Sequence, residues 1–180
     1  MYFAGAIAGF VIVGMMSDNV GRRLSLLLCL ALGIIGYLVM LLAPTLFIAG
    51  IGHLLIGFSI ESSFNLVFCL LSEMMENDHR QRMQTFIQAW LPIGGMLIAL
   101  AFYLVKEWKT IFIYLCLIPY IICFIAAYAL VVETPQFLVK RFEVLEIREN
   151  LKFIAWMNDK EKEFDSNMAL SENHIANLKT

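Results

Sequence analysis

The stretch "GMMSDNVGRR", residues 14–23, places one acid, two glycines and two arginines between apolar runs. Neither the chain before it, "MYFAGAIAGFVIV", nor the chain after it, "LSLLLCLALGIIGYLVMLLA", contains a charged residue. Roughly 20 apolar residues in a helix cross the ~30 Å hydrocarbon core of a bilayer. The polar stretch is therefore predicted to be a tight turn between two membrane-spanning helices.

The composition predicts an integral membrane protein embedded in a lipid bilayer. Of the 180 residues, 61% are hydrophobic and 16% charged, with a mean hydropathy of +0.78, whereas a soluble domain is about half apolar. The net charge is -2 and the basic residues are scattered, so we expect no nucleic-acid partner. The cysteines lie within apolar runs without paired spacing and are interpreted as small buried hydrophobes: Cys29, Cys69, Cys116 and Cys123.

Apolar runs separated by charge or proline predict five transmembrane helices, and hence an all-α, polytopic membrane helical bundle. They occupy approximately residues 2–16, 24–43, 46–72, 84–105 and 110–132. At 1.5 Å rise per residue the first run is short by about two turns. We therefore expect the chain to begin inside a span whose outer end is missing.

Lysine and arginine in the short loops predict the orientation of these spans. With residues 17–23 in the cytoplasm, only Lys106 and Lys109 fall on the opposite side. The cytoplasmic side then holds Arg22, Arg23, Arg80, Arg82, Lys140 and Arg141. Loop 17–23 and the C-terminus are thus expected to be cytoplasmic, or on the matrix side of an organelle membrane.

The chain after the last span is predicted to leave the membrane. Within residues 136–160, Val144, Ile147, Leu151 and Ile154 recur at helical spacing on one face, which predicts an amphipathic cytoplasmic helix. A helix lying on the lipid surface is the alternative. Residues 161–180 are polar and are expected to form a mobile tail.

The pattern of Gly14, Asp18, Gly21, Arg22 and Arg23 resembles the signature loop of the major facilitator superfamily, which joins the second and third helices of those transporters. The residues suit such a loop on physical grounds. Gly21 permits a sharp turn, Gly14 would let a neighbouring backbone come close, and Asp18 could pair with an arginine. A solvated interfacial turn with snorkelling arginines remains the alternative.

Three further stretches resemble the sugar porter and organic cation/anion transporter branches of this superfamily. "SEMMENDHR", with Glu73 and Arg80, resembles the acid and arginine between their fourth and fifth helices. "ETPQFLVKR", with Glu133 and Arg141, resembles a motif that follows their sixth helix. "EWK", at residues 107–109, resembles the start of that sixth helix. The resemblance implies a partial N-terminal half of the major facilitator fold, equivalent to helices two to six plus the cytoplasmic helix.

The resemblance also implies a conformational charge network at the cytoplasmic end of the bundle. Such a network would latch one face shut, because the proposed topology brings the loops that carry it to one side. Its expected members are Gly14, Asp18, Gly21, Arg22, Arg23, Glu73, Arg80, Glu133 and Arg141.

Glu61 lies close to the midpoint of the third predicted span, with Asn65 one turn away. An unpaired carboxylate at the bilayer centre costs about 3 kcal/mol on insertion scales, so Glu61 should face the bundle interior, toward Gln88 or the second span. A substrate or proton site is one interpretation, and a structural hydrogen bond of a neutral carboxyl group is the other. Gln88 and Trp90 are further candidates for the substrate pathway, whereas His53 is interpreted as a packing residue.

These observations predict part of a secondary transporter that moves a small organic solute by alternating access. The alternative is a transporter-derived structural subunit that moves nothing. No enzyme activity, cofactor or metal is expected, because the histidines are far apart in sequence and no nucleotide loop or nucleophile motif is present. The missing transporter half or another membrane subunit is the expected partner, with Gly5 and Gly9 as a place for close helix contact.

Overall fold

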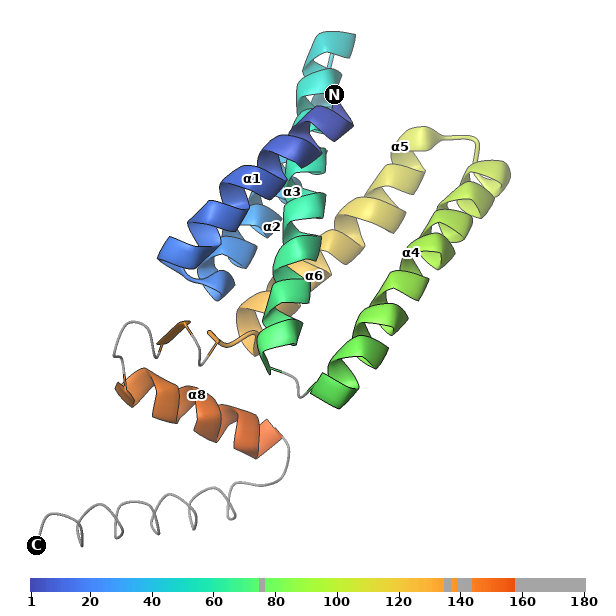
Figure 1. Cartoon of the computed structure of the whole chain (residues 1–180). Helices are drawn as coiled ribbons and strands as arrows, with labels where there is room; N and C mark the ends of the chain where they lie inside the picture. Colours follow the sequence, from blue (N-terminus) through green and yellow to red (C-terminus); the bar gives the residue numbers. More distant parts are fainter. Residues whose placement is uncertain (75–76, 135–136, 139–143, 158–180) are drawn as a thin grey trace, which may run out of the picture. The chain divides into compact units, whose positions relative to one another are not determined.

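The computed structural model describes residues 1–74, 77–134, 137–138 and 144–157, and over these ranges it is helical without strands. The chain divides into two compact units, Met1–Thr134 and Pro135–Thr180. The first unit holds α1 (Tyr2–Val20), α2 (Arg22–Leu42), α3 (Leu46–Met74), α4 (Asn77–Leu104), α5 (Trp108–Ile111), η1 (Phe112–Leu117) and α6 (Ile118–Leu130) (Figure 1).

Five helical segments of the described chain are long and apolar enough to cross a membrane: α1, α2, α3, most of α4, and the combined path of α5, η1 and α6. The first is longer than expected, with 19 residues from Tyr2 to Val20. In its polar last turns, Ser17 Oγ donates to the Gly14 carbonyl at 2.8 Å and Asn19 Nδ2 donates to the Met15 carbonyl at 2.9 Å, so these polar side chains find partners on the helix itself. Hydropathy marks the part of a helix that lies in hydrocarbon, not where the helix ends.

The predicted tight turn between the first two spans is a single residue, Gly21. Its φ of 114° and ψ of 153° break the helix between α1 and α2, in a region of backbone conformation that is essentially open only to glycine. The Gly21 N–H donates to the Ser17 carbonyl at 3.2 Å, and the Gly21 carbonyl accepts from Ser25 N–H at 3.2 Å. The two helices therefore reverse direction without losing their terminal hydrogen bonds.

Helix α3 packs along both α1 and α2, and glycines allow the close approach. A Cβ added at Gly5 would overlap the Leu54 carbonyl, and one added at Gly57 would overlap the Tyr2 carbonyl. On the other side, a Cβ added at Gly52 would lie 2.9 Å from Met40 N. Gly5 and Gly9 were expected as a place for close helix contact with a missing transporter half or another membrane protein. In the structure both lie against α3 of this chain.

A buried hydrogen bond ties α6 to α2 and α3. Ser59 Oγ on α3 donates to the Cys29 carbonyl on α2 at 2.6 Å and also bonds the Tyr120 hydroxyl on α6. Gly33 on α2 makes room for both, because a Cβ there would overlap Ser59 Oγ and the Tyr120 ring. The apolar core continues on either side of this bond with Leu30, Leu66, Tyr37 and Ile56.

Helix α4 stands apart from this core: none of its most apolar window is buried in the described structure. It begins at Asn77, earlier than the predicted residue 84, because polar residues form its first turns outside the apolar run. In the second unit, α8 (Val144–Met157) falls within the predicted amphipathic helix, and the predicted tail lies outside the described residues.

Candidate functional site

Helices α1, α3 and α6 end, and α2 begins, at the same end of the first unit (Figure 1). Charged side chains contact one another there. The Arg22 guanidinium lies 2.7 Å from Glu73 Oε1 and 3.5 Å from Asp18 Oδ1. The side chains of Arg22 and Glu73 are each 13% exposed, whereas that of Asp18 is 67% exposed. Shielding from water strengthens the Arg22–Glu73 pair, while water weakens the Asp18 contact.

Glu133 joins the same cluster through the backbone of α2. Its carboxylate accepts from Arg22 N–H at 2.8 Å and from Arg23 N–H at 3.1 Å. A carboxylate at this place satisfies free N–H groups of the first helical turn and interacts favourably with the helix dipole. The Arg23 guanidinium donates to the Tyr128 carbonyl at 3.2 Å, so the last turn of α6 is also tied to the start of α2.

Three expected members of the charge network are not found among these contacts. Arg80 is exposed and forms no ion pair with another described residue. Arg141 lies outside the described residues. A Cβ added at Gly14 would meet nothing within 4 Å, so the close backbone approach expected there is not found in the described chain.

Cys69 is a member of this cluster that the sequence did not indicate. Its thiol contacts the Arg22 guanidinium, one helical turn before Glu73 on α3. The spacing of Cys69 and Glu73 places both on one face of α3 and was the available signal. A cysteine inside an apolar run was nevertheless interpreted as a small hydrophobe.

Glu61 lies in the middle of α3 and is exposed, with Asn65 half-buried one turn further on. The Tyr2 hydroxyl on α1 donates to Glu61 Oε1 at 3.2 Å. The expected partners were Gln88 or the second span, and the observed partner comes from the first. Tyr2 was missed because a tyrosine near a helix end is also typical of the membrane interface.

Gln88 and Trp90 are both exposed on α4. The Trp90 ring meets Phe86 edge to face, with the ring centroids 5.9 Å apart. No hydrogen bond connects Gln88 to Glu61 in the part of the chain that the structure describes. The candidate pathway residues thus divide between two helices, α3 and α4.

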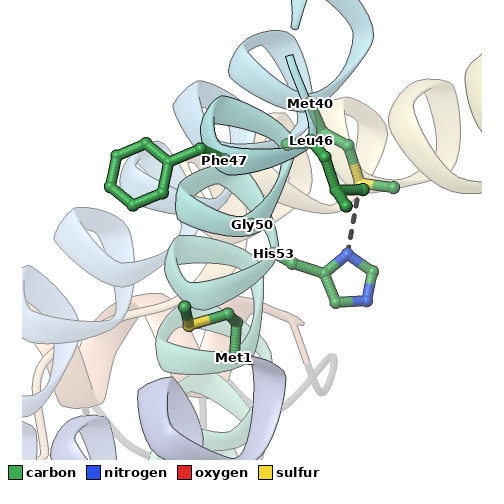
Figure 2. Close-up of a pocket in the computed structure, with 7 residues that line it drawn as sticks. Met1, Met40, Leu46, Phe47, Gly50 and His53 are labelled. Atoms are coloured by element: carbon green, nitrogen blue, oxygen red, sulfur yellow. Dashed lines mark hydrogen bonds between the residues drawn. The ribbon is translucent and has the colours of Figure 1, made fainter.

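A pocket of ≈ 720 Å³ opens at the opposite end of α2 and α3 from the charges (Figure 2). His53 lies in it, with Nδ1 3.3 Å from Met40 Sδ, and its ring lies 6.1 Å from that of Tyr2. His53 is therefore held by neighbouring side chains. The described residues contain no group of three or more histidine, cysteine or acidic side chains that could hold a metal ion. The pocket is lined by Met1, Met40, Leu46, Phe47, Ala49, Gly50 and His53.

Comparison with known proteins identifies the family of this chain. The family model described as "Sugar (and other) transporter" matches residues 1–179. The glucose transporter GlcP of Staphylococcus epidermidis is 28% identical over 151 residues, covering 82% of this chain and 33% of that protein. The carcinine transporter of Drosophila melanogaster is 24% identical over 157 residues, covering 87% of this chain and 23% of that protein.

A solved structure shows the same fold. The chain is similar to the xylose transporter XylE of E. coli, in a partially occluded inward open conformation, with a TM-score of 0.70 and 19% identity. The match covers 93% of this chain and 45% of that one. The chain thus spans less than half the length of each of these proteins.

Proposed function

Because the chain belongs to the sugar (and other) transporter family, we propose that it forms part of a secondary transporter that moves a small organic solute by alternating access. The family is one of integral, multi-pass membrane proteins that transport solutes and are not enzymes. The predicted all-helical fold of the major facilitator superfamily is confirmed by the family match and the fold likeness. Beyond the family match, we propose that the solute is a small organic molecule and that transport proceeds by alternating access.

The observation that carries the proposal is the double engagement of Arg22. Its side chain pairs with Glu73 at the end of α3, and its backbone N–H binds Glu133 after α6. Alternating access requires contacts that hold one end of a bundle closed in one state and separate in the other. Removing the charge of Glu73 leaves Arg22 with only the longer, more exposed contact to Asp18 among the described ion pairs, and breaking a fully buried pair costs about 3–5 kcal/mol as an upper bound.

The test uses the complete polypeptide in proteoliposomes, with uptake and solute affinity measured separately. In Glu73→Gln we expect the maximal uptake rate to fall about tenfold or more, with solute Kd changed by less than about twofold, because the pair is remote from the middle of the span. Glu107→Gln is the matched control, since Glu107 is exposed at the opposite end and its carboxylate accepts a hydrogen bond from the Thr110 hydroxyl. Equal uptake by the wild type and Glu73→Gln would contradict the proposed role of the Arg22–Glu73 contact in closing one end of the bundle. Absence of uptake by every form would favour a structural subunit.

The proposal also places the charged end of the bundle in the cytoplasm, or in the matrix of an organelle. In a background without native cysteines, Asn19→Cys and Lys106→Cys should react with a membrane-impermeant maleimide from opposite sides. The basic residues of the loops support labelling of Asn19→Cys from the cytoplasmic side. Labelling of Asn19→Cys from the outside would reverse the orientation.

A further inference from the structure

The path from α5 to α6 in Figure 1 contains a π-helix, η1, of six residues, Phe112–Leu117. Its hydrogen bonds span five residues, as from the Ile118 N–H to the Ile113 carbonyl. Such π-turns are rare inside α-helices and are frequent at functional sites. Pro119 follows directly, and in a regular α-helix it would lack an N–H to donate and its ring would clash with the Leu115 carbonyl. The local sequence therefore disfavours a continuous α-helix here.

The π-helix brings two aromatic residues onto one face of the segment. Phe112 and Tyr120 are eight positions apart, and around a regular α-helix their side chains would point about 80° apart. A π-turn takes more residues than an α-turn, because each hydrogen bond spans one residue more, so η1 reduces this angle. Both rings pack on the buried Tyr37 of α2, each with its centroid 5.3 Å from that of Tyr37. The π-helical register therefore accounts for the double contact with Tyr37.

The same register fixes contacts further along α6. The Tyr120 hydroxyl bonds Ser59 on α3, and Arg23 on α2 donates to the Tyr128 carbonyl in the last turn of α6. Because one continuous helix carries both tyrosines, a rotation at η1 turns them together. The aromatic contacts of Tyr37 and the charged side chains at the start of α2 are thus linked through α6.

From this geometry we propose that η1 is a register switch within the bundle. In the π-helical state, Phe112 and Tyr120 both contact Tyr37. When η1 becomes α-helical, α6 rotates by about 80° relative to α5, and Tyr120 leaves Tyr37 and Ser59 while Phe112 keeps its contact. Pro119 keeps the α-helical state the minor one. The switch goes beyond the proposed function, because it lies within this chain and needs no movement against a second part of a transporter.

Fluorine NMR of the complete protein in detergent micelles, with 3-fluorotyrosine in place of tyrosine, tests the proposal. The resonance of Tyr120 is assigned by its loss in Tyr120→Phe. Saturation transfer should reveal a second, minor Tyr120 resonance in slow exchange with the first. Pro119→Ala restores a backbone N–H and removes the ring that clashes in an α-helix, so the population of the second state should rise about tenfold or more.

Deletion of Tyr114, an exposed residue inside η1, supplies a second variant. The residues Phe112 and Tyr120 then stand seven positions apart, and on a regular α-helix they point only about 20° apart. Both rings can therefore contact Tyr37 without a π-turn. We expect one Tyr120 resonance at the position of the major wild-type resonance, without saturation transfer, and an unfolding midpoint no lower than that of the wild type.

The outcomes that overturn the switch are specific. They are the absence of a second Tyr120 resonance in both the wild type and Pro119→Ala, and a second population in the deletion variant equal to that of the wild type. If the deletion variant unfolds, Pro119→Ala decides, and an unchanged or smaller second population there contradicts the switch. Gly94→Ala on α4, where an added methyl group meets nothing within 4 Å, should keep the wild-type populations. A rise in Gly94→Ala equal to that in Pro119→Ala would also overturn the proposal.

Discussion

The Arg22 guanidinium lies 2.7 Å from the Glu73 carboxylate, while the Arg22 backbone N–H lies 2.8 Å from that of Glu133. One residue at the start of α2 is therefore bound to the end of α3 through its side chain and to the segment after α6 through its backbone. The two bonds differ in kind, because the first needs the charge of the Arg22 side chain and the second needs only a backbone N–H, which every residue except proline supplies. Substitutions of the acids can separate the two.

Glu133→Gln should destabilise the first unit more than Asp18→Asn. Glu133 accepts from two backbone N–H groups, and a hydrogen bond to a charged group contributes about 1.5–3 kcal/mol. Asp18 is 67% exposed and 3.5 Å from Arg22, and an exposed pair contributes at most about 1 kcal/mol. Thermal unfolding in detergent measures the difference, and a larger loss in Asp18→Asn would contradict the ranking.

Gly21→Ala should lower stability by about 1–3 kcal/mol, because φ 114° and ψ 153° are open only to glycine without strain. Gly14→Ala is the matched control, since an added methyl group there meets nothing within 4 Å. The same unfolding assay applies to both. Equal midpoints for the two variants would show that the Gly21 backbone is free to relax.

The sequence predicted the positions of the helices along the chain better than it predicted which face of each helix meets its neighbours. Gly21 and Arg22 could be identified from the sequence, because a polar turn between two apolar runs of a membrane protein must lie at the membrane surface. Tyr2 and Cys69 do not stand out, because α1 and α3 are apolar on most sides, and hydropathy then leaves open which face meets which neighbour. The partner of Glu61 was misplaced for this reason.

The same limitation applies to expectations taken from a family pattern. Arg80 was expected in the charge network from its spacing to Glu73, yet it lies on an exposed early turn of α4. Gly5 was recognised as a place for close helix contact, but spacing alone could not say whether that contact lies within the chain. Pairwise contacts between helices supplied what periodicity did not.

Gly33→Ala should destabilise the junction of α2, α3 and α6 by about 1–3 kcal/mol through overpacking. The new methyl group would overlap Ser59 Oγ and lie 2.5 Å from the Tyr120 hydroxyl. Tyr120→Phe removes one of these atoms and should restore part of the loss in the double variant. Gly94→Ala on α4 has open space and should keep the wild-type midpoint, so a similar loss there would point to a general effect of alanine.

The 180-residue chain alone is expected not to transport. Alternating access places the solute between two parts that move against each other, and the chain spans only 33% of GlcP and 45% of the solved XylE chain. Within the described structure, Glu61 is exposed and the most apolar window of α4 has no buried residue, so these parts of α3 and α4 are uncovered. Proteoliposomes that contain only this chain should show no saturable uptake of glucose. Full-length GlcP, assayed with glucose under the same conditions, is the positive control, and saturable uptake by the chain as a monomer would contradict the expectation.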